Sequence, residues 1–257
     1  MHIVAINGSH RGDKGLTRVF LDRLGWGAAA AGGEFEVVTL AKLKINRCLS
    51  CYRCQNGDPH LVCAHSERDD VAMVFEKMAG ADIVIYATPV YLMNMSGLMK
   101  TFLDRTYATM DCQDARLSSG LIHHHINPAI SSKPFVLLVV CGNVENETWR
   151  NVTSYFRTYA RFMEARQVVV LVRNASALFD TTSDPELVEE FPRIADVRVA
   201  FEQAGRELAT LGRISRSTQR RANQEIVPVP FFGLLKHLRP VKLRVIEYLR
   251  SKETKER

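Results

Sequence analysis

Residues 7–17 hold the first group of side chains that suggests chemistry. They read Asn-Gly-Ser-His-Arg-Gly-Asp-Lys-Gly-Leu-Thr and follow a short apolar run at the N-terminus. Glycines let a backbone approach a ligand closely, and the N–H groups at the start of a helix attract a dianionic phosphate. Ser9 and Thr17 add hydroxyl donors, and Arg11 adds a charged donor. The segment has neither the P-loop nor the dinucleotide fingerprint, so a phosphate site and an ordinary strand-to-helix turn both remain open.

A second group consists of four of the six cysteines. Cys48, Cys51, Cys54 and Cys63 form a C-x2-C-x2-C-x8-C pattern, whose first spacings match those of ferredoxin cluster ligands. Three alternatives remain open: a [4Fe–4S] cluster, a zinc ion held by four thiolates, or reduced cysteines that pack a loop without a metal. Such clustering indicates metal or redox chemistry more than a disulfide framework. We interpret the isolated Cys112 as structural.

The hydrophobic pattern predicts the elements that position these residues. Residues 81–87 (ADIVIYA) are too apolar for a strand of an exposed sheet, whereas residues 16–31 have apolar side chains at helical spacing. Five strands alternating with five helices predict right-handed crossovers and a parallel sheet covered on both faces. Ligands then bind beyond the carboxyl ends of the strands. The predicted strands are 2–6, 35–40, 81–87, 134–141 and 168–172, and the predicted helices are 16–31, 66–80, 96–107, 148–166 and 185–211.

The loop after the third predicted strand carries a more specific motif. Pro89-Val90-Tyr91, Ser96, Lys100 and Asp104-Arg105 match without a gap the Pro-Val-Tyr…Ser…Lys…Asp-Arg string of the NADPH-dependent FMN reductases. Over roughly residues 1–175 the chain resembles this branch of the flavodoxin-like superfamily. The resemblance implies an α/β fold with a flavodoxin-like, doubly wound, five-stranded parallel sheet and helices on both faces. We expect a C-terminal helical extension beyond it.

The resemblance also implies that FMN is the cofactor, with NADPH or NADH as electron donor. Asp13 lies beside the expected phosphate, and we expect its carboxylate to turn outward or to be offset by Lys14. Lys100, Asp104 and Arg105 either contact the cofactor or form a solvated helix surface. By the resemblance, the phosphate would be held by Ser9, Arg11, Gly15, Leu16 and Thr17; the isoalloxazine would lie beside Pro89, Val90, Tyr91, Leu92, Met93 and Asn94; and Cys141, Gly142 and Asn143 would close its other edge.

The cysteine motif resembles that of the iron–sulfur flavoproteins of the same superfamily, although its last gap is longer. In those proteins a [4Fe–4S] cluster passes electrons to FMN at a dimer interface. We therefore predict an FMN-dependent oxidoreductase that passes electrons from NAD(P)H or an iron–sulfur donor to an unidentified small-molecule acceptor. The alternative is a non-enzymatic iron–sulfur/FMN electron-transfer protein. FMN performs the chemistry in either case, so no general acid or base is named.

Composition and charge set the remaining expectations. The hydrophobic content of 46% indicates a globular core. No apolar run reaches the ~18–20 residues of a membrane span, and the N-terminus lacks the pattern of a signal peptide, so we expect a cytoplasmic protein. Residues 213–257 contain 12 Lys and Arg against 4 Asp and Glu, so they carry the excess behind the net charge of +6.

We accordingly predict a flavodoxin-like FMN-binding domain over residues 1–212 and a basic amphipathic helical extension over residues 213–257. The extension is expected to pack on the domain or on a partner copy rather than on an anionic membrane. We expect a homo-oligomer (dimer or tetramer) and no binding to nucleic acid, because no recognition motif accompanies the charge. Residues 112–132 are expected to be an insertion at the rim of the site, with His123–His125 in a rim loop rather than on a metal.

Overall fold

The chain folds around a twisted parallel sheet. The computed structural model describes residues 1–118, 120–144, 147–179, 191–226, 232–235 and 237–253. The five parallel strands run in the order β2-β1-β3-β7-β8, and a short antiparallel strand, β4, pairs with the end of β3. This is the flavodoxin-like order, so the predicted fold class is confirmed. The strands are β1 His2–Asn7, β2 Glu34–Thr39, β3 Ile83–Tyr91, β4 Asn94–Met95, β7 Phe135–Val140 and β8 Gln167–Arg173.

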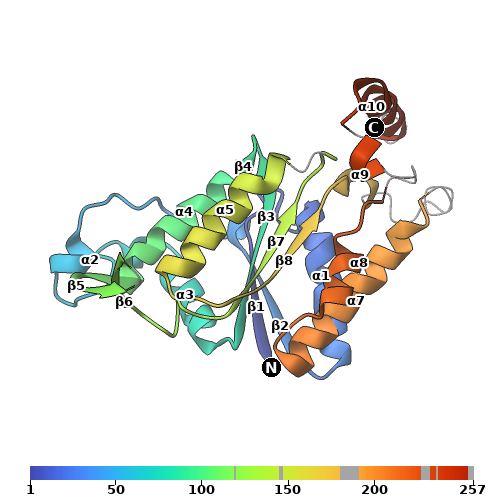
Figure 1. Cartoon of the computed structure of the whole chain (residues 1–257). Coiled ribbons are helices and arrows are strands. Elements are labelled where there is room, and N and C mark those ends of the chain that lie inside the picture. The colour runs from blue at the N-terminus through green and yellow to red at the C-terminus, as the bar shows by residue number, and fades with distance from the viewer. Residues whose placement is uncertain (119, 145–146, 180–190, 227–231, 236, 254–257) are drawn as a thin grey trace.

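Helices cover both faces of this sheet (Figure 1). The central strands β1, β3 and β7 consist mostly of apolar residues because both of their faces are buried. Ile3 and Ala5 of β1 pack toward one helical layer, whereas Val4 and Ile6 pack toward the other. One layer consists of α1 Leu16–Ala30, α7 Arg193–Leu211 and α8 Arg216–Ala222, and the other consists of α3 Val71–Gly80, α4 Gly97–Arg105 and α5 Glu147–Phe162.

Two glycines bring α1 and α7 into direct backbone contact. A Cβ atom at Gly27 would lie 1.8 Å from the carbonyl oxygen of Glu202, and one at Gly205 would lie 2.0 Å from that of Leu24. Neither position therefore accepts a side chain. This contact holds α1, whose first residues border the predicted phosphate loop, firmly against the last long helix.

Two predicted segments differ in the structure. The helix expected over 66–80 begins only at Val71, because Asp69 is extended and its Oδ1 accepts the N–H of Val71 at 3.3 Å. Residues 112–132 contain a β-hairpin, β5 Met110–Ser118 and β6 Leu121–Ile126, which lies beside the short helix α2 Arg53–Asn56 (Figure 1). The three histidines lie in β6 rather than in a loop, so they point alternately to opposite faces of the hairpin. The first part of the helix predicted over 185–211 lies outside the described residues.

The beginning of the C-terminal extension covers part of the sheet edge that β8 forms. The side-chain amide of Asn223 accepts the N–H of Val172 at 2.9 Å and donates to the carbonyl oxygen of Val170 at 3.2 Å. An edge strand exposes unpaired backbone groups, and Asn223 satisfies two of them on β8. Ala222 and Ile226 are buried in the same core as α1 and α7. The boundary at residue 212 stays a prediction, but residues 213–226 pack against the sheet.

Buried Arg173, at the end of β8, makes a further connection to this segment. Its guanidinium donates to the carbonyl oxygens of Asn174 at 2.9 Å, Ala222 at 3.1 Å and Gln224 at 2.8 Å. Burial lowers its pKa to about 10. The cation therefore sits at the carboxyl end of α8, where the helix dipole favours positive charge.

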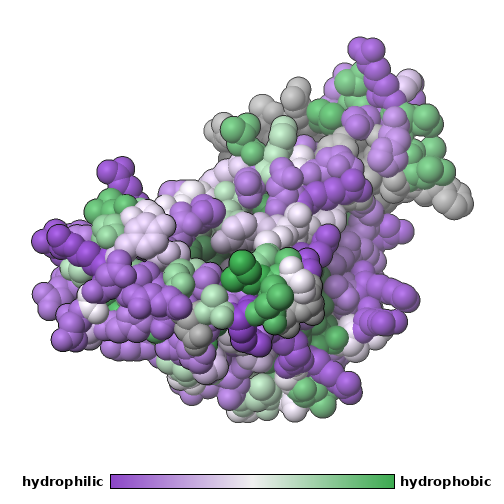
Figure 2. Space-filling model, turned by 60° about the vertical axis from the view of Figure 1, so that its left-hand side comes forward, coloured by the Kyte–Doolittle hydropathy of each residue, from purple (hydrophilic) through white to green (hydrophobic). Residues whose placement is uncertain are grey.

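Beyond these contacts, α9 Phe232–Leu235 and α10 Arg239–Glu253 project from the body (Figure 1). Hydrophobic and hydrophilic side chains lie side by side on this projection, at the upper right of Figure 2. Leu238 and Leu243 are exposed there. None of the described helices combines the length and the hydrophobicity that a bilayer span requires.

Removal of the Asn223 amide tests the docking of the extension. We expect Asn223→Ala to lower the free energy of unfolding by about 1–3 kcal/mol, because it leaves the N–H of Val172 without a partner. The carbonyl oxygen of Val170 loses one donor but still accepts the side-chain amide of Gln219 at 3.0 Å. Urea unfolding followed by circular dichroism measures this change. The control is Arg220→Ala, which removes an exposed side chain of the same helix. Equal stability of the two variants would contradict this account of the sheet edge.

Candidate functional site

The predicted phosphate loop connects β1 to α1 and is braced from within. The side chain of Asn7 accepts the N–H of Ser9 at 3.1 Å and donates to the carbonyl oxygen of Gly12 at 3.3 Å. A single 3-10 turn, Gly12–Lys14, leads to Gly15, the N-cap of α1. No side chain caps this helix, so its N-terminal N–H groups are available to an anion. Asn7 was not among the predicted site residues, although it directly precedes the glycine that marks the loop.

Two further features of this loop fit a phosphate. The Oγ1 atom of Thr17 is buried and has no hydrogen-bond partner among the described residues. A buried hydroxyl without a partner is costly, and a phosphate oxygen would satisfy it. A Cβ atom at Gly15 would lie 2.5 Å from Oγ of Ser9, so only glycine lets this hydroxyl lie against the helix start. Ser9 is buried beside it, whereas Arg11 is exposed and Leu16 is half-buried.

Asp13 points away from this cradle. Its carboxylate pairs with Lys42 and Arg18 and accepts the hydroxyl of Thr39 at 2.7 Å. The hydrogen bonds from Lys42 and Thr39, with the charge of Arg18, lower the pKa of Asp13 to about 2. Asp13 has therefore turned outward, as the sequence suggested, but Lys42 and Arg18 offset its charge rather than Lys14.

The loop after β3 is tied to the phosphate loop by Ser96. Its hydroxyl donates to the carbonyl oxygen of Gly8 at 2.5 Å and accepts the N–H of Met99 at 3.1 Å, so it also caps α4. The N–H of Gly8 in turn donates to the carbonyl oxygen of Ala87 at 2.8 Å. The rings of His10 and Tyr91 stack with their centres 6.1 Å apart. The ends of β1 and β3 therefore form one continuous rim.

The residues predicted to lie beside the flavin ring occupy the end of β3, the Leu92–Met93 turn and the start of β4. Pro89 is buried and Val90 is half-buried, while Tyr91 to Asn94 are exposed. Leu92 and Met93 have φ angles of 44° and 64°, in the left-handed region that is costly for such side chains. The side chain of Asn151 in α5 donates to the carbonyl oxygen of Met93 at 3.1 Å and helps to hold this turn.

The third predicted edge, after β7, has its own contacts. Cys141 is buried, and its sulfur lies 3.2 Å from Oγ1 of Thr148. Its N–H donates to the carbonyl oxygen of Arg173, and its carbonyl oxygen accepts the N–H of Ser176. Gly142 and Asn143 are exposed at the same edge of the sheet. The assignment of these three residues to FMN stays a prediction.

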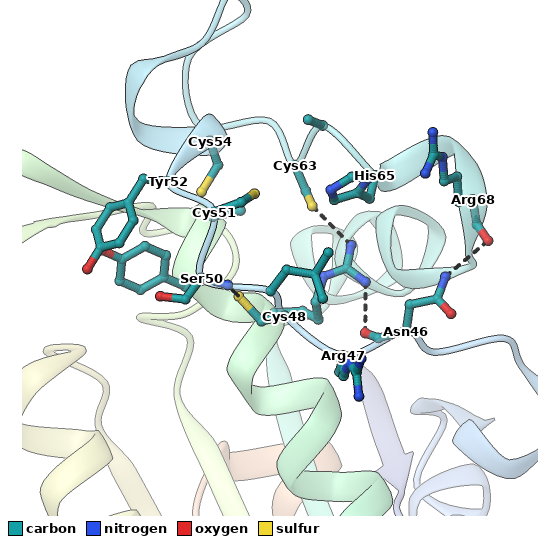
Figure 3. A pocket seen from close by; sticks show the side chains of 15 residues that line it. Asn46, Arg47, Cys48, Ser50, Cys51, Tyr52, Cys54, Cys63, His65 and Arg68 are labelled. Atoms are coloured by element: carbon teal, nitrogen blue, oxygen red, sulfur yellow. Dashed lines mark hydrogen bonds between the residues drawn. The ribbon is translucent and has the colours of Figure 1, made fainter.

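A second site lies at the cysteine segment. All four cysteines of the motif line one cavity of about 260 Å³. Figure 3 shows their sulfur atoms around this space, with the side chains of Tyr52 and His65 on opposite sides of it. Ser50 and Tyr52 have φ angles of 51° and 57°, so the backbone between the cysteines is held in a sparsely populated conformation. Such strain is common at sites that bind a ligand.

Hydrogen-bond donors contact the sulfur atoms of Cys48, Cys54 and Cys63. The N–H of Ser50 lies 3.4 Å from Sγ of Cys48, and the guanidinium of Arg105 donates to Sγ of Cys63 at 3.3 Å. Burial raises the pKa of the Cys54 thiol; a contact with Gln55 opposes this, and the charges of Cys63 and Cys48 raise it further. The thiols therefore influence one another. A bound metal centre would stabilise all of them as thiolates.

Gln55 is a buried residue that the sequence did not single out. Its amide donates to the carbonyl oxygen of Met110 at 2.8 Å and accepts the N–H of Cys112 at 2.8 Å. It thereby fastens the cysteine segment to the β5–β6 hairpin. The thiol of Cys112 donates to the hydroxyl of Tyr107, a residue that lines the cavity, at 3.3 Å.

One helix connects the two sites. α4 begins at the Ser96 cap, which ties the two loops at the carboxyl ends of β1 and β3, and ends at Arg105, which contacts Cys63. Its nine residues span roughly 14 Å. Lys100 and Asp104 form an exposed ion pair on this helix, so they follow the surface interpretation, whereas Arg105 is buried.

The structure combines a phosphate cradle, a Pro-Val-Tyr segment and a doubly wound sheet. A comparison with models of protein families gives a match that is consistent with these features. A model of the family described as NADPH-dependent FMN reductase matches residues 1–175. The chain belongs to this family. The family assignment made from residues 89–105 is therefore confirmed. The matched residues include both the phosphate loop and the cysteine segment.

Curated relatives of this FMN reductase family member include iron–sulfur proteins. An iron-sulfur flavoprotein of Archaeoglobus fulgidus is 35% identical over 106 residues, which cover 41% of this chain and 49% of that protein. A putative NAD(P)H-dependent FMN-containing oxidoreductase of Bacillus subtilis is 31% identical over 110 residues, 43% of this chain and 54% of that protein. The chain thus spans about half the length of the curated relatives that it matches.

Solved structures share the fold at low identity. An FMN-dependent NADH-azoreductase from Bacillus anthracis, in complex with FMN, superposes with a TM-score of 0.58 at 12% identity, covering 82% of this chain and 100% of that one. An NAD(P)H:quinone oxidoreductase from Methanothermobacter marburgensis gives 0.53 at 17% identity, covering 81% and 98%. At these identities the likeness supports the flavodoxin-like fold and nothing finer.

Proposed function

We propose that the protein is an FMN-dependent oxidoreductase that takes electrons from NADPH or NADH and passes them to a small-molecule acceptor. The observation that carries this proposal is the cradle at the start of α1, where the unpartnered hydroxyl of Thr17 and the bare Gly15 face an uncapped helix end. Membership of the NADPH-dependent FMN reductase family supports the same cofactor.

The residues of the chain bind and orient the cofactor in this proposal. Ser9, Thr17 and the N–H groups of α1 hold the phosphate, and the Leu92–Met93 turn borders the ring. FMN itself, when bound, supplies the capacity to accept and release electrons. Ser96 keeps the two loops in register, because one hydroxyl bonds to Gly8 on one side and caps α4 on the other.

We further propose that Cys48, Cys51, Cys54 and Cys63 hold a [4Fe–4S] cluster that exchanges electrons with FMN. Support comes from the shared cavity, from the N–H donors to sulfur and from the name of the Archaeoglobus fulgidus relative. Within the described residues, no three Cys, His, Asp or Glu side chains surround one point closely enough to hold a single metal ion. A [4Fe–4S] cluster would be held by the four thiolates of the motif and would supply one-electron transfer.

Anaerobic reconstitution tests both parts of the proposal. We expect about one FMN and about four iron and four sulfide per chain, with a flavin spectrum that bleaches on addition of NADPH or NADH. Absence of saturable FMN binding would contradict the first part. Iron and sulfide that remain far below stoichiometric amounts would contradict the second.

A second candidate is a non-enzymatic electron-transfer protein, which the cysteine cavity also favours. In that case NAD(P)H alone leaves the FMN oxidised, while reduced ferredoxin or dithionite reduces it. Anaerobic stopped-flow mixing with NADPH separates the two candidates. A homo-oligomeric state and the packing of the tail on a partner copy stay predictions, which sedimentation of the full-length chain would test.

A further inference from the structure

We infer that Arg105 sets the reduction potential of the metal centre held by the cysteine cavity, with Asp69 limiting its effect. This inference rests on the cluster proposed above. The decisive contact is the hydrogen bond of 3.3 Å from Nη2 of Arg105 to Sγ of Cys63. Arg105 also lines the cavity itself.

The arginine is fixed in place by groups on another segment. Its Nη1 donates to the carbonyl oxygen of Asn46 at 3.0 Å and pairs with Oδ2 of Asp69. Asp69 is held in turn by the N–H of Asn46 at 3.1 Å and by the N–H of Val71 at 3.3 Å. The side chains of Arg105 and Asp69 are only 3% and 0% exposed. The guanidinium is therefore aimed at Cys63 without freedom to swing away.

Burial makes this charge effective. Coulomb interactions weaken strongly in water and are several times larger in a partly buried site, and a guanidinium remains charged at any physiological pH. A solvated Arg on the same helix would be screened. Arg47 and Arg68 also line the cavity, but Arg105 donates a charge-assisted hydrogen bond to a sulfur atom of the motif.

The sign of the effect follows from charge. Reduction adds an electron to the cluster, so a nearby positive charge favours the reduced form and raises the potential. Hydrogen bonds to the ligand sulfurs act in the same direction, since second-sphere donors and charge tune iron–sulfur potentials. Asp69 partly cancels the charge of Arg105. Removal of the arginine should therefore lower the potential, and removal of the aspartate charge should raise it.

A redox titration of the reconstituted holoprotein, followed by electron paramagnetic resonance of the cluster, tests the inference. For Arg105→Gln we expect the ratio of reduced to oxidised cluster at a fixed applied potential to fall about tenfold or more. For Asp69→Asn we expect that ratio to rise. Arg105→Lys retains the positive charge but not the fork of the guanidinium, so the ratio should fall by less than in Arg105→Gln. The matched control is Lys100→Gln, an exposed cation of the same helix, which should leave the potential unchanged.

A general loss of structure would shift the reduction potentials of Arg105→Gln and Asp69→Asn in the same direction. Opposite shifts in the two variants therefore cannot come from it. An unchanged potential in iron-loaded Arg105→Gln protein, or an equal fall in Arg105→Lys, would overturn the inference and leave the cluster proposal intact. Wild-type protein that takes up no iron and sulfide would instead overturn the cluster, and this inference with it. Asp69→Asn could fail to fold, because it leaves a buried guanidinium unpaired. The potentials of Arg105→Gln, Arg105→Lys and Lys100→Gln then still test the inference.

Discussion

Gly15→Ala is expected to weaken FMN binding about 100-fold, a loss of about 2.7 kcal/mol. The added methyl carbon would lie 2.5 Å from Oγ of Ser9 and 3.3 Å from Cβ of Arg11. The Ser9 hydroxyl would have to rotate out of the cradle, and the methyl group would occupy part of the space next to the helix N–H groups. Both changes remove interactions with a dianionic phosphate. Quenching of FMN fluorescence on titration with apoprotein measures the dissociation constant.

Gly97→Ala provides the matched control. Gly97 also lies at a helix start, as the residue that follows the Ser96 cap of α4, but a Cβ atom there meets nothing within 4 Å. We expect this variant to bind FMN as wild type does. Equal losses in the two variants would mean that helix starts in general, rather than the cradle, determine affinity. Wild-type affinity in Gly15→Ala would show that the phosphate binds elsewhere.

Cys54→Ser is expected to lower the iron content of anaerobically reconstituted protein about tenfold or more, because a cluster held by three thiolates and a poor fourth ligand is easily lost. FMN binding should persist, since the phosphate cradle belongs to other elements. Iron and sulfide assays, together with the visible spectrum of the same sample, report both groups at once.

Cys112→Ser is the control for this experiment. Cys112 lies in β5 of the neighbouring hairpin and contacts Tyr107, but it is not one of the cysteines that line the cavity. Its substitution should leave the iron content unchanged. Full iron content in Cys54→Ser would remove the basis for a cluster bound by the motif. Loss of iron in both variants would point to a general disturbance of the hairpin and cysteine segment.

The helix α4 links the two sites that these experiments test. A change at one end of the helix is expected to leave the other end intact, because Ser96 and Arg105 are each fixed by separate partners. Flavin binding and iron binding should therefore be lost independently. We expect electron exchange between the two groups, in contrast, to require both ends of this helix to be in place.

The sequence by itself determined the class of fold and the two candidate sites. Residues 83–87 of the predicted strand 81–87 are buried on both faces in the structure, as their composition required, whereas Asp82 is exposed and β3 begins at Ile83. The glycine-rich loop and the cysteine spacing are local features, because a turn depends on the backbone freedom of its own residues and a metal motif on nearby thiols. The Pro-Val-Tyr string is equally local, and it placed the chain in its family.

Only the tertiary structure decided which charges act at the sites. Asp13 faces Lys42 and Arg18 rather than the phosphate, and Gln55 fastens the cysteine segment to a hairpin more than fifty residues away in the chain. From its position in the Pro-Val-Tyr string alone, Arg105 could contact the cofactor or lie on a solvated helix surface. Its role depends on Asp69 and Asn46, which reach it from a segment far away in the sequence. Burial and charge pairing arise from contacts between distant segments, and a helical period or a short motif contains no information about those contacts.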